Sequence, residues 1–332
     1  MTLRVGVVGV GTMGADHAGR LARRIANADL VAVSDPDLPR AKELAGQFND
    51  VRVVEEPLDL VTDPGVDAVV LASPGWVHEE QLLACLAHAK PVLCEKPLTM
   101  DAESSLRLLA AEREASRPLV QVGFMRRFDP EYAELKQVLD SGSLGRTLLL
   151  HNVHRNKAAP NPDFRSEMIV RDSLVHEVDV ARWVFGEEIV EITVHSPSPS
   201  SLAPDGVQDP QVTVFRMAGG AVVTNEVFVN SQLGYEVRCE AVAERGTATA
   251  GLGSGVVTRT RGRWGGSVPD DYRVRFARAY DLEVQAWVDA CRRGEVTGPT
   301  AWDGYASTVV CSAGMASLRE GRPVAVELAA RP

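Results

Sequence analysis

The sequence has 332 residues, of which 45% are hydrophobic and 24% are charged. This composition is ordinary for a globular protein, and the length predicts about two domains. The net charge of −10 argues against nucleic acid or an anionic membrane as a partner, because phosphate groups are bound chiefly by clustered Lys and Arg side chains. We find no stretch with the length and hydrophobicity of a membrane span and no leader of the secretory type, and we therefore expect a cytoplasmic protein.

Between Leu3 and about Val122, short apolar runs alternate with helix-like segments. Near-continuous apolar strands separated by helices are typical of a parallel sheet that is covered on both faces. The sequence thus predicts an α/β fold with a doubly wound parallel sheet over residues 1–122. The predicted strands are 3–8, 30–34, 51–54, 68–72, 91–94 and 119–122.

After Gly123 the pattern changes: a helix is predicted at about 130–140 and a strand at 147–153, and later strand-like runs follow one another through tight turns. Adjacent strands with short connections favour an antiparallel sheet, so we expect a second α/β domain over 123–332. A segment rich in Ser and Pro, 196–204, is predicted to be a loop within it. The later strands are expected at 189–194, 211–217, 221–229, 235–243 and 247–250, and two closing helices at about 279–293 and 302–320.

The segment Gly9–Gly14 follows the first predicted strand, opens a helix and has the spacing Gly-x-Gly-x-x-Gly. In this context the pattern predicts a dinucleotide-binding turn. The first glycine allows the tight turn, the second lets the pyrophosphate approach the backbone, and the third allows close packing of helix on sheet. The helix N-terminus then faces the anion. The candidate cofactor contacts in this turn are Gly9, Gly11, Thr12, Met13 and Gly14.

Asp35 lies at the end of the second predicted strand, about twenty residues beyond the glycine turn. A carboxylate there can accept hydrogen bonds from the ribose hydroxyls of an adenosine. A 2′-phosphate would meet like-charge repulsion, and no Arg follows at once to neutralise it, so NAD is favoured over NADP. The alternative is that this segment only caps the next helix, which Asp37 could do alone.

Lys96 follows the predicted strand 91–94, and ligands of open α/β sheets lie outside the carboxyl ends of strands. From there its ammonium group can donate to a substrate hydroxyl and stabilise negative charge that develops on the oxygen. The alternative is an exposed lysine that merely leaves the sheet. The Lys96–Pro97 peptide bond is a candidate for the cis form. Glu95, which precedes Lys96, is counted with it among the candidate cofactor contacts.

Ser73 and His78 follow the preceding strand in the same way, so their turn is expected to line the cofactor. His78 has two interpretations, either a contact with the cofactor or simply the start of a helix. His17, just beyond the glycine turn, is expected to pack against the second domain rather than to react.

Asp172, His176 and Asp179 have the spacing i, i+4 and i+7, which places them on one face of a helix. A histidine suits the removal of a hydroxyl proton, because its unperturbed pKa of about 6.5 is near the working pH. Asp172 could orient that imidazole, stabilise its charged form or bind a neighbouring hydroxyl. The alternative is an amphipathic helix with a solvated polar face, although apolar residues such as Trp183 border that face.

His151 and His154 lie three residues apart in a predicted strand, so they point to opposite faces. A zinc site needs three or four convergent ligands, and the five cysteines lie far apart without a Cys-x-x-Cys pair. We therefore expect no metal site and interpret the cysteines as buried thiols.

The sequence also resembles the Gfo/Idh/MocA family of NAD(P)-dependent oxidoreductases over nearly its whole length. The glycine turn and Glu95–Pro97 are motifs of the family at large. Gly123–Arg127 and His154–Asn156 point to its inositol dehydrogenase branch, and the segments 172–179 and 234–240 also match.

The resemblance implies a Rossmann domain that binds NAD, followed by a domain with an open sheet that binds substrate and assembles a homotetramer. It implies oxidation of myo-inositol to 2-keto-myo-inositol (scyllo-inosose), with Lys96, Asp172 and His176 as the catalytic group and His176 as proton acceptor. Several side chains would then bind ring hydroxyls, since each unpaired polar group costs roughly 1–3 kcal/mol. They are Met125, Arg126 or Arg127, His154, Asn156, Asp172, His176, Asp179 and Tyr235.

Two departures from the family pattern leave the substrate open. Ser173 stands where the inositol branch usually has Thr, and 157–163 replaces the more usual run after Asn156. The alternatives are scyllo-inositol, an aminocyclitol or a pyranose such as glucose. A different class of function, a non-catalytic NAD-binding regulator that keeps the fold, is opposed by the intact catalytic group.

Overall fold

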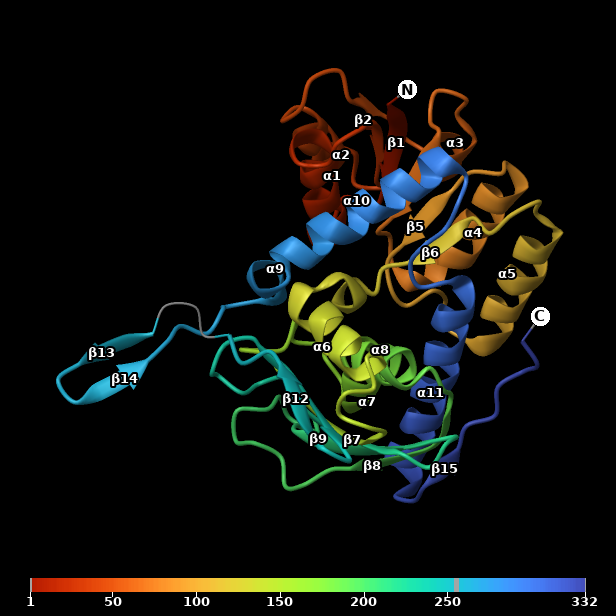
Figure 1. Ribbon diagram of the computed structural model, residues 1–332. Helices are drawn as coiled ribbons and strands as arrows, with labels where there is room; N and C mark the ends of the chain where they lie inside the picture. Colours follow the sequence, from red (N-terminus) through yellow and green to blue (C-terminus); the bar gives the residue numbers. More distant parts are fainter. Residues whose placement is uncertain (1, 254–256, 332) are drawn as a thin grey trace. The chain divides into compact units, whose positions relative to one another are not determined.

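The structure is a computed structural model that describes residues 2–253 and 257–331. The chain forms two compact units, whose elements are labelled in Figure 1. The expected division into 1–122 and 123–332 differs from these units in two respects, because the boundary follows Met125 and because two C-terminal segments return to the first unit. Unit 1 contains Met1–Met125, Tyr280–Thr308 and Ala329–Pro332, and unit 2 contains Arg126–Ala279 and Val309–Leu328.

Unit 1 holds a six-stranded parallel sheet in the order β3-β2-β1-β4-β5-β6. This is the strand order of doubly wound dinucleotide-binding folds, so the predicted fold class is confirmed. Strands β4, β5 and β6 are buried along their whole length, as expected for a sheet covered on both faces. The strands are β1 (Leu3–Val8), β2 (Ala28–Ser34), β3 (Arg52–Val53), β4 (Ala68–Leu71), β5 (Val92–Cys94) and β6 (Val120–Val122).

The helices of unit 1 begin in two ways. Helix α1 starts at Gly11 without a side-chain cap, whereas Asp37 caps α2 by accepting a hydrogen bond from the Arg40 amide. The return segment belongs to this unit because Trp287 and its apolar neighbours on α10 (Ala277–Arg293) are buried in the same core as β1 and β2. The N-terminal helices are α1 (Thr12–Arg23), α2 (Leu38–Ala45), α3 (Pro57–Thr62), η1 (Gly75–Val77), α4 (His78–Ala87) and α5 (Ala102–Glu114).

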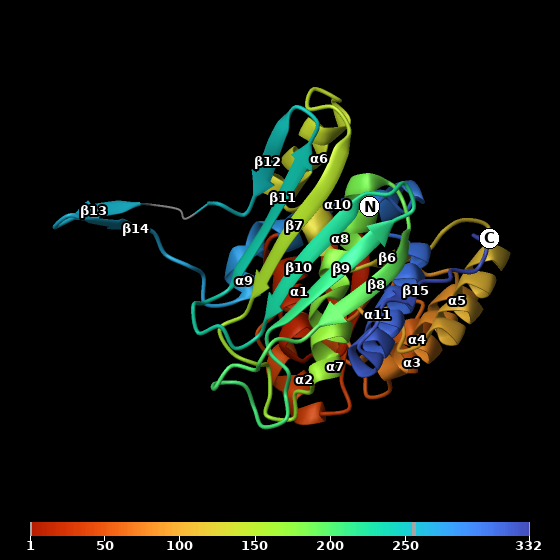
Figure 2. The same ribbon diagram turned by 90° about the horizontal axis from the view of Figure 1, so that it is seen from below.

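Unit 2 holds a seven-stranded sheet in the order β12-β11-β7-β10-β9-β8-β15, which Figure 2 shows nearly face on. The pairings are antiparallel except that of β10 with β7, so the expected largely antiparallel sheet is confirmed with one parallel pair. The strands are β7 (Thr147–Arg155), β8 (Ile189–His195), β9 (Gln211–Met217), β10 (Val222–Phe228), β11 (Glu236–Ala243), β12 (Gly246–Ala250) and β15 (Val324–Ala325).

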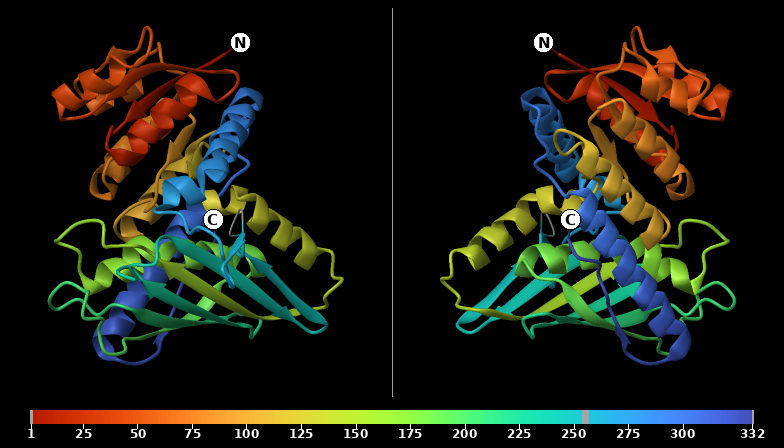
Figure 3. Two further views of the ribbon diagram at one scale, coloured as in Figure 1. Left: turned by 90° about the vertical axis from the view of Figure 1, so that its left-hand side faces the viewer. Right: turned by 90° about the vertical axis from the view of Figure 1, so that its right-hand side faces the viewer.

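One face of this sheet is covered by α6 and α8, and no helix of the described residues lies on the other face (Figure 3). Burial accordingly alternates along β9 from residue to residue. The remaining elements in or entering unit 2 are η2 (Met125–Phe128), α6 (Pro130–Asp140), α7 (Ser166–Met168), the π-helical η3 (Ile169–Ser173), α8 (Val175–Phe185), β13 (Thr258–Thr260), β14 (Arg263–Gly265), α9 (Tyr272–Arg275) and α11 (Ala301–Glu320).

Candidate functional site

The glycine turn of unit 1 has the geometry that its spacing predicts. Gly9 has φ of +82°, and a Cβ there would lie 2.5 Å from the Ser73 amide nitrogen. A Cβ on Gly14 would lie 1.7 Å from the Gly9 carbonyl oxygen, so only glycine allows α1 to pack this close to the turn. A Cβ on Gly11 would meet nothing within 4 Å. Packing within the protein therefore explains Gly9 and Gly14, while the open space at Gly11 suits a ligand that approaches the backbone.

Asp35 is buried at the end of β2 and faces this turn. Its carboxylate accepts hydrogen bonds from the amides of Val10 (2.8 Å) and Asp37 (2.9 Å). Arg40, which the sequence pattern did not single out, is brought back by the first turn of α2 to 4.0 Å from Asp35 and 2.7 Å from Asp37. The acidic end of β2 is thus fixed by the backbone and has a cation beside it.

A cavity of about 690 Å³ in unit 1 is lined by both features, with Gly9 and Gly11 on one side and Asp35 on another. Its size is in the range of small-molecule sites. Leu58 and Trp76 add apolar surface to the lining, which suits a flat heterocycle, and Asp35 suits sugar hydroxyls. Thr12 and Met13 form the first turn of α1 beside Gly11. These residues fit an NAD molecule, with its pyrophosphate at the N-terminus of α1.

The strand-end residues Ser73 and His78 are joined by a hydrogen bond. His78 begins α4 and is only 1% exposed, and its ring nitrogens lie 2.8 Å from the carbonyl oxygens of Ser73 and Pro97. Burial lowers the pKa of His78, although both carbonyl contacts oppose that shift. The Ser73 hydroxyl donates to the Gln81 side chain. The Lys96–Pro97 peptide bond is cis.

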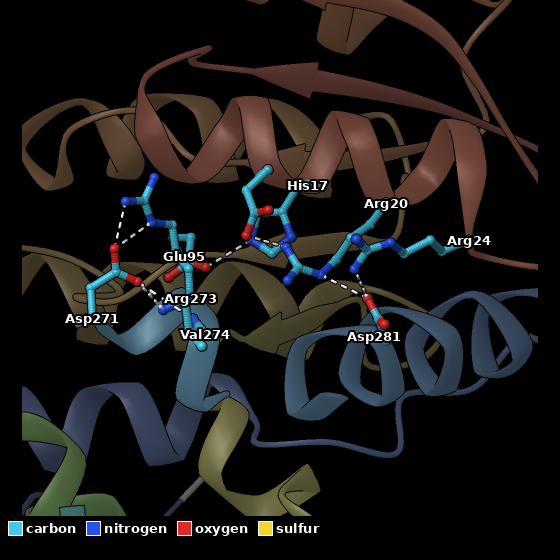
Figure 4. Close-up of polar contacts among 9 residues, drawn as sticks. His17, Arg20, Arg24, Glu95, Asp271, Arg273, Val274 and Asp281 are labelled. Atoms are coloured by element: carbon cyan, nitrogen blue, oxygen red, sulfur yellow. Dashed lines mark hydrogen bonds and ion pairs between the residues drawn. The ribbon is translucent and has the colours of Figure 1, made fainter. Parts of the chain in front are cut away.

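His17 lies inside unit 1, within the group of side chains that Figure 4 shows. Its Nε2 atom is 2.8 Å from Glu95 Oε1, and its ring meets Tyr280 edge on with 6.0 Å between the centroids. Tyr280 falls in the expected second domain by its number but in unit 1 by its position. The packing partner of His17 is thus the returning C-terminal segment.

The helix predicted around Asp172 consists of two kinds of turn in unit 2. Asp172 lies in the π-helical η3, and its carboxylate pairs with the neighbouring Arg171 at 2.7 and 2.8 Å. His176 and Asp179 follow in α8 and are 8% and 1% exposed. The alternative of a solvated polar face is therefore wrong for His176 and Asp179, which are buried within the unit, whereas Asp172 is partly exposed.

Asp179 is neutralised by Arg127, which donates two hydrogen bonds to its carboxylate at 3.0 and 2.6 Å. Such a bidentate pair fixes the planes of both groups. The two residues that the resemblance assigned separately to the substrate are therefore one ion pair.

A second ion pair in unit 2 contains a residue that sequence reasoning missed. Glu177 is fully buried and accepts a hydrogen bond from Arg126, and His154 Nδ1 lies 3.2 Å from its carboxylate. Burial alone would raise the pKa of Glu177, but the charges of Arg126 and His154 lower it to about 2. Glu177 directly follows His176 on a helix, a position that by spacing alone reads as an ordinary surface acid.

Two of the remaining predicted contacts, His176 and Tyr235, lie near His154 in unit 2. Its ring lies 5.7 Å from that of Tyr235 and 6.4 Å from that of His176, measured between centroids. Burial raises the pKa of Tyr235 to about 12. Oδ1 of Asn156 is buried and has no hydrogen-bond partner among the described residues. Met125 is also buried and closes the N-terminal segment of unit 1.

The remaining predictions concern metal ligands and cysteines. His151 is exposed and bonds Thr224, whereas His154 is buried, so the predicted opposite orientation is confirmed. No group of three or more His, Cys, Asp or Glu side chains in residues 2–253 and 257–331 is placed to hold a metal ion. All five cysteines are buried. Within the part of the chain that the structure describes, no helix combines the length and hydrophobicity needed to cross a membrane.

The chain is similar to inositol dehydrogenases in both sequence and structure. Inositol 2-dehydrogenase 4 of Saccharopolyspora erythraea is 54% identical over 99% of this chain and 97% of its own length. An inositol 2-dehydrogenase of Mycolicibacterium smegmatis is 53% identical over 99% and 97%.

Among solved structures, a myo-inositol dehydrogenase of Lactobacillus casei in complex with NAD(H) and myo-inositol has a TM-score of 0.96 at 33% identity, covering 100% of this chain and 99% of that one. A scyllo-inositol dehydrogenase from the same organism has a TM-score of 0.92 at 25% identity, covering 98% and 99%.

Two family models match consecutive parts of the sequence. Residues 3–124 match the oxidoreductase family with an NAD-binding Rossmann fold, and residues 132–249 match the GFO/IDH/MocA C-terminal domain. The resemblance stated from the motifs is therefore confirmed, and the chain belongs to the Gfo/Idh/MocA family of NAD-binding oxidoreductases.

Proposed function

We propose that this protein oxidises myo-inositol to 2-keto-myo-inositol, with NAD as the hydride acceptor. The observation that carries the proposal is the buried polar cluster of unit 2, in which His154, His176 and Tyr235 lie together. A cyclic polyol presents hydroxyls all round its ring, and such a cluster offers several partners for them. Relatives at more than half identity, named inositol 2-dehydrogenases, support the same substrate.

Oxidation of a secondary alcohol removes a hydride from carbon, for which bound NAD supplies the acceptor, and a proton from oxygen. We assign the proton to His176, whose neutral imidazole can accept it. Lys96 donates a hydrogen bond to the same oxygen and stabilises the negative charge that develops there. Asp172 favours the charged form of His176 or binds a neighbouring hydroxyl.

The other ring hydroxyls are assigned to side chains of the polar cluster and its neighbours. Between the two arginines we favour Arg127, because its side chain is 16% exposed and that of Arg126 only 2%, while each is paired with a carboxylate, Arg127 with Asp179 and Arg126 with Glu177. Asp179 then acts mainly by holding Arg127. The remaining contacts are Met125, His154, Asn156 and Tyr235.

The experiment is an initial-rate panel with purified protein and NAD, followed by the absorbance of NADH. We expect the highest kcat/KM with myo-inositol among myo-inositol, scyllo-inositol, chiro-inositol and glucose. A higher value with scyllo-inositol, chiro-inositol or glucose would keep the enzyme class and change the substrate, for which the buried Ser173 beside Asp172 is the first residue to examine. No turnover with any of them would favour a non-catalytic NAD-binding regulator.

We also propose a cytoplasmic homotetramer. The sheet face of unit 2 without a helix among the described residues carries exposed valines on β8 and β9, Val190 and Val212, and suits a contact with a second copy. Five buried cysteines suit a reducing compartment. Light scattering during size-exclusion chromatography tests the assembly, and a charged replacement such as Val212→Glu should reduce the measured mass of the oligomer.

A further inference from the structure

Two buried histidines flank the turn Glu95–Pro97, which carries Lys96 beyond the end of β5. His17 comes from α1, the helix that begins at the glycine turn, and His78 is the first residue of α4. Their exposed fractions are 0% and 1%. Both contact this turn from within unit 1, and neither is needed for the reaction steps assigned above.

His17 acts on the turn through Glu95. One carboxylate oxygen of Glu95 lies 2.8 Å from His17 Nε2, and the other accepts a hydrogen bond from the Lys96 amide at 3.3 Å. A Cβ on Gly123 would lie 3.2 Å from this carboxylate, so the end of β6 closes it in from another side. The Glu95 carboxylate therefore has little freedom to move. Through its two contacts, the position of α1 constrains the backbone of Lys96.

The His17 ring is itself held in place. Tyr280 meets it edge on, and the Arg20 guanidinium lies 5.0 Å from the centre of the Tyr280 ring. Arg20 in turn donates to Asp281 at 2.9 Å, as Figure 4 shows. The contact between His17 and Glu95 is therefore the last in a series of side-chain contacts that runs from Asp281 through Arg20 and Tyr280 to His17.

His78 acts on the other end of the turn. Its Nδ1 atom lies 2.8 Å from the Pro97 carbonyl oxygen, and its Nε2 atom lies 2.8 Å from that of Ser73. The ring thus bridges the segments that follow β4 and β5. Lys96 stands between one residue held by His17 and one held by His78.

We propose that His17 and His78 are positioning residues that hold the backbone of Lys96 where its ammonium group serves the reaction. This inference rests on the role proposed for Lys96. The backbone position of Lys96 sets where its side chain begins and therefore which positions its ammonium group can reach. Displacement of a reacting group by about 1 Å can cost about 100-fold in rate.

The test compares His17→Gln and His78→Gln with Lys96→Ala and with His88→Gln, a matched control at the exposed C-terminal end of α4. We expect both buried variants to lower kcat about 10- to 100-fold. The dissociation constant of NADH, measured by fluorescence, should change less than about twofold, and the deuterium isotope effect on kcat should rise because hydride transfer becomes slower. His88→Gln should match the wild type.

Glu95 variants keep the test decisive if His17→Gln does not fold. Glu95→Gln retains an acceptor for His17 and should lose less turnover than Glu95→Ala, in which kcat should fall as far as is expected for His17→Gln. The double variant His17→Gln/Glu95→Ala should be no slower than the slower single variant, because the pair acts as one unit.

The experiment distinguishes failure of the role proposed for Lys96 from failure of the positioning proposal. If Lys96→Ala retains turnover, the proposed function of Lys96 fails. If Lys96→Ala is inactive while folded His17→Gln and His78→Gln, or Glu95→Ala, keep wild-type kcat and isotope effect, only the positioning proposal is overturned.

Discussion

The two units hold their candidate contacts by different means. In unit 1 the cavity is shaped by backbone, through Gly9 with its positive φ and Gly14 with no room for a Cβ. In unit 2 the contacts are side chains held by buried ion pairs, Arg126 with Glu177 and Arg127 with Asp179. Backbone geometry leaves a mark in residue spacing, whereas a network of side chains from separate elements does not. The cofactor contacts of unit 1 are therefore easier to predict from the sequence than the side-chain contacts of unit 2.

The largest effect is expected from replacing groups that take part in the reaction itself, because turnover should fall while NAD binding is retained. His176→Ala and Lys96→Ala should each lower kcat about 10²- to 10⁴-fold, the usual contribution of a proton acceptor or a placed donor. The affinity for NAD, measured by calorimetry, should stay near the wild-type value, because neither residue holds the pyrophosphate or the adenosine. Loss of NAD binding in both variants would show that the roles are misassigned.

Glu177→Ala should break the side-chain network of unit 2. It leaves the Arg126 guanidinium buried without its carboxylate, which typically costs about 3–5 kcal/mol. We expect that loss in the free energy of unfolding measured with urea. Glu134→Ala, at an exposed position of α6 in the same unit, is the control and should change the free energy by less than about 0.5 kcal/mol. Equal effects of the two substitutions would contradict the network.

Gly14→Ala should disturb the glycine turn of unit 1, whose shape depends on the backbone. Its Cβ would lie 1.7 Å from the Gly9 carbonyl oxygen, so the turn or the helix must shift, at about 1–3 kcal/mol of stability. NAD affinity should fall with it. Gly19→Ala in the same helix is the control, because its Cβ meets nothing within 4 Å and alanine favours helix by roughly 1 kcal/mol. A Gly14 variant that binds NAD as tightly as the Gly19 variant would refute the packing argument.

Asp35→Ser should shift the cofactor preference towards NADP by about tenfold or more, because a like charge next to the 2′-phosphate is removed. Arg40, 4.0 Å from Asp35, should supply part of the new affinity, so Asp35→Ser/Arg40→Ala should shift less. The ratio of kcat/KM for the two cofactors measures both. Asp37→Ser is the control, and an unchanged ratio in Asp35→Ser would contradict the assignment.

The last prediction concerns the pH dependence of stability. The charges of Arg126 and His154 overcome burial and lower the pKa of Glu177 from its usual 4.5 to about 2 in the folded state. The stability that this charge contributes is complete above the unfolded pKa, and it is lost as pH falls through the folded value. Unfolding free energy should therefore decline between pH 4.5 and about 2, and Glu177→Gln should flatten that slope. Parallel slopes would mean that another carboxylate is responsible.

Much of the fold followed from local patterns. Fully apolar runs such as β4 predicted a parallel sheet covered on both faces, and adjacent strands with tight connections predicted the largely antiparallel sheet of unit 2. The parallel pairing of β10 with β7 and the return of Trp287 into the core of unit 1 were not predicted. Both depend on contacts between segments far apart in the chain, which leave no local pattern.

The candidate site shows the same limit at the level of single residues. Spacing placed Asp172 and His176 together but missed the π-helical turn at Asp172 and the burial of Asp179. Spacing also did not predict the contact between His17 and Glu95, whose Nε2 and Oε1 atoms lie 2.8 Å apart.

The sequence by itself determined the dinucleotide turn, the order of strands and helices and the family, because each depends on short-range spacing or on whole-chain similarity. Only the tertiary structure decided which of the polar side chains contact one another. Glu177 contacts Arg126 and His154, Asp179 contacts Arg127, and Glu95 contacts His17. The reason is physical: a buried charge must be paired, and its partner comes from whichever element packing brings within reach.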